Sequence, residues 1–150
     1  MTERADQLRL ADDLKQRLGR LLTQTSIDER PISFNVELVR AILLGTKTQT
    51  RRPLVGGRFR KLMPGQRLSV REKWGRLDGR FVHAASGELT GVRFFGGQSM
   101  PREARRLTLD VRTYRVEPLQ SISERDARAE GAPTSLSPAE ARVWFQSIWE

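Results

Sequence analysis

Apolar residues near the start of the chain recur at steps of three and four, which is the spacing of one helix face. The apolar members of this series are Leu8, Ala11, Leu14, Leu18 and Leu21. We predict an amphipathic helix over residues 3–22 that packs on the rest of the chain or on a second copy of itself. A homodimer through this helix is therefore one expected partnership. A polar connector from Thr23 to Arg30 follows the helix.

A second helix is predicted over residues 36–44. Asn35 is a suitable N-terminal cap, and Gly45 favours the left-handed conformation that ends a helix. The residues expected on its buried side are Val36, Val39, Ile42 and Leu43.

Two further helices are predicted near the end of the chain. Ser121 and Glu124 have the spacing of a capping box, which indicates a short helix that runs to about Glu130 and stops at Gly131. Residues 137–140, Ser-Pro-Ala-Glu, are a stronger start signal because proline suits the first helical turn. The apolar residues expected on this last helix are Val143, Trp144, Ile148 and Trp149.

Alternation of apolar and polar residues predicts the strands. The expected strands are residues 32–34, 68–71, 80–84, 90–95 and 107–116. The third and fourth are expected to form a hairpin across Ser86-Gly87, and Pro64-Gly65 is the turn that leads into the second. The last strand has the longest alternation and is predicted to be central. The sum is an α+β fold with a small, curved sheet or barrel.

Composition limits the class of protein. A chain of 150 residues with 37% hydrophobic and 30% charged residues is typical of one soluble globular domain. No apolar run approaches the ~20 residues that span a bilayer, and the N-terminus lacks a signal-peptide core, so we expect a cytoplasmic protein without membrane contact. The chain has no cysteine, which excludes disulfides and thiolate metal sites. His83 is the only histidine, which disfavours both a zinc site and a Ser-His-Asp triad.

The charge balance favours a polyanionic partner. The formal net charge is +9 and the pI is near 11.2. Nucleic acid or nucleotide contact is the expectation that follows, with a base-composition bias of the genome toward arginine as the alternative.

One short polar segment stands out as candidate chemistry, the sequence Gly-Thr-Lys-Thr-Gln-Thr-Arg-Arg at residues 45–52. The 27 basic residues include only four lysines, Lys15, Lys47, Lys61 and Lys73, so the other 23 are arginines. Lysine can lose its proton when it is desolvated, whereas arginine stays charged. A scarce lysine close to the Thr50 hydroxyl is therefore a candidate site; the alternative is a solvated, charged loop.

Three separated segments together resemble the ASCH domain family, whose β-barrel is like that of the PUA RNA-binding domain. They are residues 45–52, 64–70 and 122–131, and the family pattern matches Gly45, Lys47, Thr50 and Arg52. The phrases at residues 30–34 and 100–102 fit the phage and bacterial branch. The resemblance covers about residues 31–149 and implies a PUA-like domain at 31–150. The N-terminal helix and connector at 1–30, which the apolar spacing predicts, precede that domain.

One ASCH branch resembles an amidohydrolase that removes the acetyl group from N4-acetylcytidine. The resemblance implies that Lys47, Thr50 and Glu130 are the catalytic residues and that neither a cofactor nor a metal is needed. Thr50 would supply a hydroxyl or position a water, Lys47 would accept the proton, and Glu130 would orient the lysine or activate water. Arg52 would face an anion or the oxyanion. Residues 47 and 50 point to opposite faces of a flat strand, so this site requires a turn or bulge after Gly45.

Another ASCH branch resembles a ribonuclease acting on single-stranded RNA, and a non-catalytic RNA-binding or regulatory module is a third alternative. The candidate RNA- or substrate-binding residues are Arg51, Arg52, Arg58, Arg60, Lys61, Arg71 and Trp74, with Arg102, Arg105 and Arg106 as further phosphate contacts. Trp74, Phe94 and Phe95 would stack on bases or, alternatively, pack in the core. Glu103 departs from the phage branch, which has an aromatic residue there.

Overall fold

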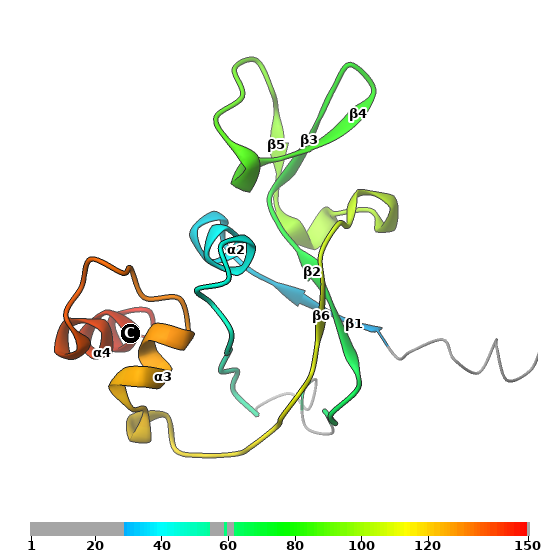
Figure 1. Cartoon of the computed structure of the whole chain (residues 1–150). Helices are drawn as coiled ribbons and strands as arrows, with labels where there is room; N and C mark the ends of the chain where they lie inside the picture. The colour runs from blue at the N-terminus through cyan, green and yellow to red at the C-terminus, as the bar shows by residue number, and fades with distance from the viewer. Residues whose placement is uncertain (1–28, 55–58, 60–61, 150) are drawn as a thin grey trace, which may run out of the picture.

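Three helices and two small sheets form the part of the chain that the computed structural model describes, which is residues 29–54, 59 and 62–149. Figure 1 shows the two sheets above one another and the last two helices to one side. The predicted N-terminal helix at residues 3–22 lies outside the described residues, as do Arg58, Arg60 and Lys61. No helix within the described ranges is long and apolar enough to cross a membrane.

The first sheet has the strand order β1-β2-β6, with β1 at Glu29–Ser33, β2 at Arg67–Arg71 and β6 at Thr108–Asp110. β1 and β2 are parallel, whereas β2 and β6 are antiparallel. β1 begins at Glu29 rather than Ile32, so residues 29–30 belong to the sheet and not to the predicted connector. The strand predicted over 68–71 is confirmed as β2.

The prediction of a long central strand over 107–116 was wrong, because β6 covers only Thr108–Asp110 and lies at the edge. Val111 still pairs with the turn before β2, donating to Gln66 O at 2.9 Å and accepting from Gly65 N at 2.8 Å. The chain turns at Pro64-Gly65 before β2 begins, so residues after Val111 have no residue of β2 opposite them in this sheet.

The helix α2, Val36–Leu43, connects β1 to the segment before β2 and packs on the sheet. Asn35 caps it as predicted, accepting a hydrogen bond from Leu38 N at 2.9 Å, and Gly45 has a φ of 75°. Leu43 was wrongly placed on the buried side, since it is 48% exposed. The apolar core between helix and sheet contains Ile32, Phe34, Val39, Leu68, Val70, Ala85 and Val111.

The second sheet has the order β4-β3-β5, with β3 at Trp74–Leu77, β4 at Arg80–His83 and β5 at Phe94–Phe95. The hairpin predicted between residues 80–84 and 90–95 was wrong, because β4 and β5 each pair with β3 and not with each other. The signal was present as Asp78-Gly79, whose φ values of 49° and 77° suit a two-residue hairpin turn. Gly75 lets β5 approach, since a Cβ there would lie 2.8 Å from Arg93 O.

The helices α3, Glu124–Ala129, and α4, Pro138–Ser147, pack against each other at the end of the chain. Ser123, not Ser121, caps α3, because its side chain accepts from Asp126 N; the Ser121 hydroxyl instead donates to Pro118 O. The Ser137 capping box of α4 is confirmed. Its buried residues are Ala141 and Phe145, whereas the predicted Val143 and Ile148 are 65% and 51% exposed.

Short 3-10 turns complete the connections, at Ala84–Ser86, Gly97–Ser99, Arg102–Ala104 and Leu119–Ser121. The predicted α+β class is confirmed. Within the described ranges the strands form two open sheets and no closed barrel, so the PUA-like barrel stays a prediction.

Candidate functional site

The segment after Gly45 is irregular, and two helix ends hold it. Thr46 N and Lys47 N both donate to Ala41 O of α2, at 2.9 and 3.0 Å. Thr48 N and Gln49 N both donate to Ala129 O at the end of α3, at 2.8 and 2.9 Å. The segment is therefore not a flat strand. Lys47 and Thr50 both line one cavity, an arrangement predicted from the sequence to need a turn or bulge after Gly45.

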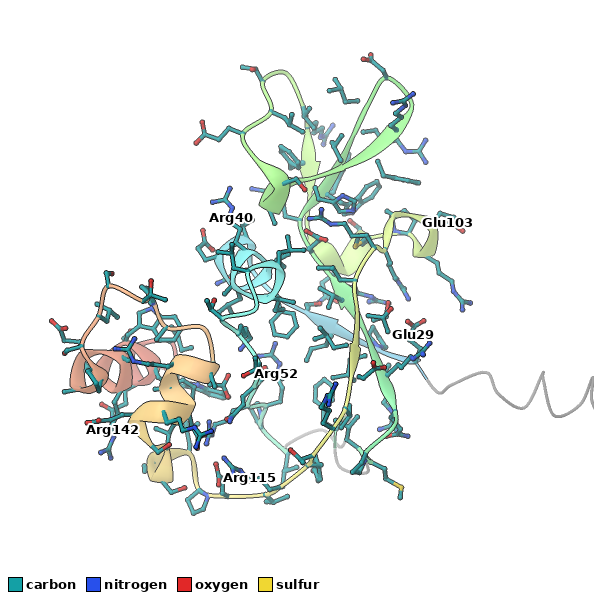
Figure 2. All side chains as sticks on the ribbon, viewed as in Figure 1. Glu29, Arg40, Arg52, Glu103, Arg115 and Arg142 are labelled. Atoms are coloured by element: carbon teal, nitrogen blue, oxygen red, sulfur yellow. The ribbon has the colours of Figure 1, made fainter. Side chains whose placement is uncertain are left out.

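That cavity has a volume of about 1060 Å³, which is the upper end of the range for small-molecule sites. Its apolar walls come from the first sheet, α2 and the residues after α4, and they include Ile32, Phe34, Ile42, Leu68, Leu109, Val111 and Trp149. Its polar lining includes the predicted Lys47, Thr50, Arg51, Arg52 and Glu130. Figure 2 shows Arg52 in the interior between the first sheet and α3, and Arg115 near the 3-10 turn before α3.

Lys47 and Glu130 form a buried ion pair at this cavity. They are 7% and 4% exposed, and Lys47 Nζ lies 3.1 Å from Glu130 Oε2. Nζ also donates to the carbonyl oxygens of Gln49 and Glu130, each at 2.7 Å. Three acceptors match the three protons of an ammonium group, so the resting side chain is held in its charged form.

Burial nevertheless lowers the pKa of Lys47 below its ordinary 10.5, because desolvation disfavours the charged form. The attraction of Glu130 and the hydrogen bond to it act in the opposite direction, and the nearby Arg52 lowers the pKa further. Lys47 therefore gives up its proton more readily than a lysine in water does.

Arg51 binds carboxylates on three sides. Its guanidinium bonds Glu130 Oε1 at 3.2 Å and Asp126 Oδ2 at 3.5 Å, and a short contact joins it to Glu117. It also lies over the Phe145 ring, 5.7 Å from its centroid. The predicted role was substrate or RNA contact, whereas these bonds hold Glu130 in place from the side opposite Lys47.

Arg52 turns toward the first sheet. It donates to Ser33 O at 2.8 Å and lies over the Phe34 ring at 5.0 Å, on which Lys47 Nζ also lies at 5.5 Å. Burial lowers the pKa of Arg52, but an arginine stays protonated at neutral pH. The electron-rich face of Phe34 thus makes cation–π contacts with both Lys47 and Arg52.

Thr50 Oγ1 is buried and makes no hydrogen bond within the described part of the chain. A hydroxyl without a partner beside a buried lysine is free to meet a ligand atom. Gly131 allows the close fit of this region, since a Cβ there would lie 3.2 Å from Leu38 Cδ2 and 3.4 Å from Lys47 Cβ.

Five predicted binding residues lie away from the cavity: Arg71, Trp74, Arg102, Arg105 and Arg106. Trp74 belongs to the second sheet and contacts Phe81 and Phe95 with ring centroids 5.8 and 5.2 Å apart, which is the core-packing alternative. Arg71 ends β2 and does not line the cavity either. Arg106, proposed for phosphate, instead binds Glu72 through two bonds of 2.8 and 2.9 Å.

Sequence reasoning missed several residues of the site, among them Gln49, Tyr114, Glu117, Asp126 and Trp149. Asp126 accepts from Gln49 Nε2 at 2.9 Å and from Arg115 at 2.9 Å. One signal was available, since Asp126 precedes Glu130 by four positions and so shares its face of the helix. Tyr114 and Trp149 carried no comparable local signal.

His83 has a structural contact, with its Nε2 donating to Ala104 O at 2.7 Å. Across residues 29–54, 59 and 62–149 no three side chains of His, Cys, Asp or Glu gather as a metal site.

No family model, no curated protein and no solved structure matches the chain.

Proposed function

We propose that this chain is an ASCH-type, PUA-like domain that hydrolyses the amide of an acylated cytidine, such as N4-acetylcytidine, without a metal. The observation that carries the proposal is that Lys47 and Thr50 from one segment and Glu130 from the end of α3 line one cavity. Lys47 and Glu130 are directly paired there, and Thr50 Oγ1 makes no hydrogen bond among the described residues.

The reaction runs through Thr50 as nucleophile. Its Oγ forms a bond to the acyl carbon while its proton passes to a neutral Lys47 Nζ. The bond from the acyl carbon to N4 then breaks, and N4 takes that proton and leaves as the amine of cytidine. Water attacks the acyl-Thr50 in the same way, which releases acetate and restores the hydroxyl. The sum is one amide and one water converted to one amine and one carboxylic acid.

Glu130 acts through Lys47 in this scheme. The resting ammonium must first lose a proton to solvent, and Glu130 Oε2, 3.1 Å from Nζ, then accepts a hydrogen bond from the neutral amine and orients it. Arg51 fixes the other oxygen of Glu130, so the carboxylate keeps its orientation toward Nζ. Desolvation of Lys47 favours this loss of the proton because it destabilises the buried ammonium charge.

The test follows loss of N4-acetylcytidine by ultraviolet absorbance, in EDTA, with wild type, Thr50→Ser and Thr50→Val. We expect turnover by wild type, reduced turnover by the serine variant, which keeps a hydroxyl, and none by the valine variant, which keeps the shape alone. Unchanged substrate after long incubation with wild type would reject the proposal.

RNA is the second candidate, favoured by the formal net charge of +9. Binding that neutralises phosphates releases counterions and so weakens steeply with salt. A labelled single-stranded RNA incubated in EDTA distinguishes the possibilities: cleavage supports the ribonuclease, salt-sensitive binding alone supports the RNA-binding module, and no shift at low salt removes both.

A further inference from the structure

Unpartnered polar atoms concentrate at the cavity. Seven buried side-chain nitrogen or oxygen atoms of the described residues have no hydrogen-bond partner. Four belong to residues that line the cavity, namely Thr50 Oγ1, Arg51 Nε, Tyr114 OH and Trp149 Nε1. Folded proteins leave few such atoms unpaired, because each one loses its bonds to water without replacement. Their grouping around one space points to a ligand that supplies the partners.

The chemistry of these atoms defines what that ligand carries. Trp149 Nε1 and Arg51 Nε can only donate, and the hydroxyls of Tyr114 and Thr50 can donate as well as accept. The nearby carboxylate acceptors are already engaged, since Glu130 binds Lys47 and Arg51, and Asp126 binds Gln49, Arg51 and Arg115. The cavity is therefore short of acceptors, and the missing ones must come from the ligand.

The ion pairs of Lys47 and Arg51 indicate that the part of the ligand beside these two side chains is uncharged. Lys47 is neutralised by Glu130, and Arg51 contacts Glu117, Asp126 and Glu130. Arg52 is directed to Ser33 O and the Phe34 ring. A phosphate or carboxylate would compete with the carboxylates already bound to Lys47 and Arg51, whereas a neutral carbonyl oxygen or ring nitrogen would not.

We propose that Tyr114 and Trp149 are specificity-determining residues that hydrogen-bond an uncharged heterocyclic edge carrying at least two acceptors, such as the pyrimidin-2-one ring of cytidine. This identification of the ligand rests on the proposed function, but the binding role of the two residues can be measured without turnover. Tyr114 follows β6 and Trp149 follows α4, so the ligand would join the first sheet to the helix pair.

The test is calorimetric titration of cytidine, uridine and cytidine monophosphate into the full chain. The variants are Tyr114→Phe, which removes the hydroxyl, and Trp149→Phe, which removes the indole N–H. Trp144→Phe is the matched control, because Trp144 lies on α4, packs on the helix pair and does not line the cavity. Melting temperatures without ligand report whether any variant damages the fold.

We expect wild type and the control to bind cytidine alike, and each test variant to bind it about five- to tenfold more weakly, the effect of one hydrogen bond. Melting temperatures of the test variants should not fall by more than that of the control, because the free protein makes no hydrogen bond at either atom among the described residues.

Three outcomes would overturn the inference: no binding of cytidine or uridine by wild type, equal affinity in wild type and both test variants, or binding that requires the phosphate of the monophosphate. Its failure is distinguishable from failure of the proposed function. If the variants bind cytidine more weakly but wild type does not hydrolyse N4-acetylcytidine, the binding site is supported and the proposed reaction is rejected. If wild type hydrolyses N4-acetylcytidine but the variants bind cytidine as tightly as wild type does, the reaction is supported and the binding role of Tyr114 and Trp149 is rejected.

Discussion

At the scale of single residues, opposing influences act on the pKa of Lys47. Three acceptors surround Lys47 Nζ, which favours the ammonium, while burial favours the neutral amine. Desolvation is the largest of the influences on its pKa, and its direction is downward. Lys47 therefore holds its proton at rest and loses it at a lower pH than a lysine in water does.

The pH dependence of turnover tests this role. Since the neutral amine is the active form, the rate constant should rise with pH through the pKa of Lys47, with a midpoint below 10.5. Lys47→Arg keeps a positive charge but cannot lose its proton, so we expect a fall of about 100-fold or more and no rise with pH. The exposed Lys73→Arg is the matched control. Full activity of Lys47→Arg would exclude Lys47 as the base.

Asp126 provides a second residue-level prediction. Its hydrogen bond from Gln49 is the main reason that its pKa lies below the ordinary 3.8, helped by Ser123, Arg115 and Arg51. A lowered pKa gives stability that is present above the unfolded-state pKa and is lost as pH falls through the folded-state pKa. In Asp126→Asn, the free energy of unfolding should therefore fall less steeply with acid, by at most about 1 kcal/mol.

Chemical denaturation at a series of acidic pH values measures this difference. Asp110→Asn is the comparison variant, because it removes a carboxylate whose pair with Arg67 lies in solvent. The same change in both variants would contradict the role given to the contacts of Asp126.

At the scale of elements, the ends of two helices place the site. The C-terminal carbonyls of α2 and α3, at Ala41 and Ala129, receive the N–H groups of residues 46–49. Glu130 is the C-cap residue of α3, and Gly131 follows with a φ of 104°. The catalytic candidates therefore lie where two helices stop, and their relative position depends on how those helices end.

Gly131→Ala tests this dependence. An alanine there would adopt an unfavourable positive φ, at about 1–2 kcal/mol, and its Cβ would crowd Leu38 and Lys47. We expect lower stability and lower turnover together. Gly79→Ala is the control, because Gly79 also has a positive φ but has nothing within 4 Å of the added Cβ. Equal turnover in the two variants would show that the end of α3 does not position the site.

At the scale of the whole molecule, an ion pair with a buried carboxylate and a partly exposed arginine lies where the two sheets meet. Glu72 is 1% exposed, between β2 and β3, and Arg106 reaches it from the segment before β6. Arg106 also donates to Ser86 Oγ at 2.7 Å, after β4. Segments distant in sequence are thus joined at one carboxylate, which connects the second sheet to the first (Figure 1).

Arg106→Ala should lower the free energy of unfolding by about 3 kcal/mol, because Glu72 remains buried without its partner. Adding Glu72→Gln should recover part of the loss, since a neutral amide is cheaper to bury. Denaturant unfolding of the single and double variants measures both effects. Arg67→Ala, which breaks a solvent-exposed pair with Asp110, should change stability by about 0.5 kcal/mol or less. No recovery in the double variant would contradict this assignment.

The sequence by itself determined the local features. Asn35, the Ser137 box and the left-handed Gly45 and Gly131 mark helix ends as predicted, because caps depend on groups within one turn. The errors at the same scale have local causes too: Ser123 outcompetes Ser121 as a cap, and the Asp78-Gly79 turn was overlooked.

Only the tertiary structure decided which distant groups meet. The strand orders, the three carboxylates around Arg51, the pairing of Arg106 with Glu72 and the position of Tyr114 and Trp149 at the cavity all join residues far apart in the chain. The sequence shows that a helix or strand face is apolar and that a residue is charged. It does not show which distant element packs on that face or which group binds that charge. That choice follows from burial, which leaves a charged or polar group few places where its bonds can be replaced.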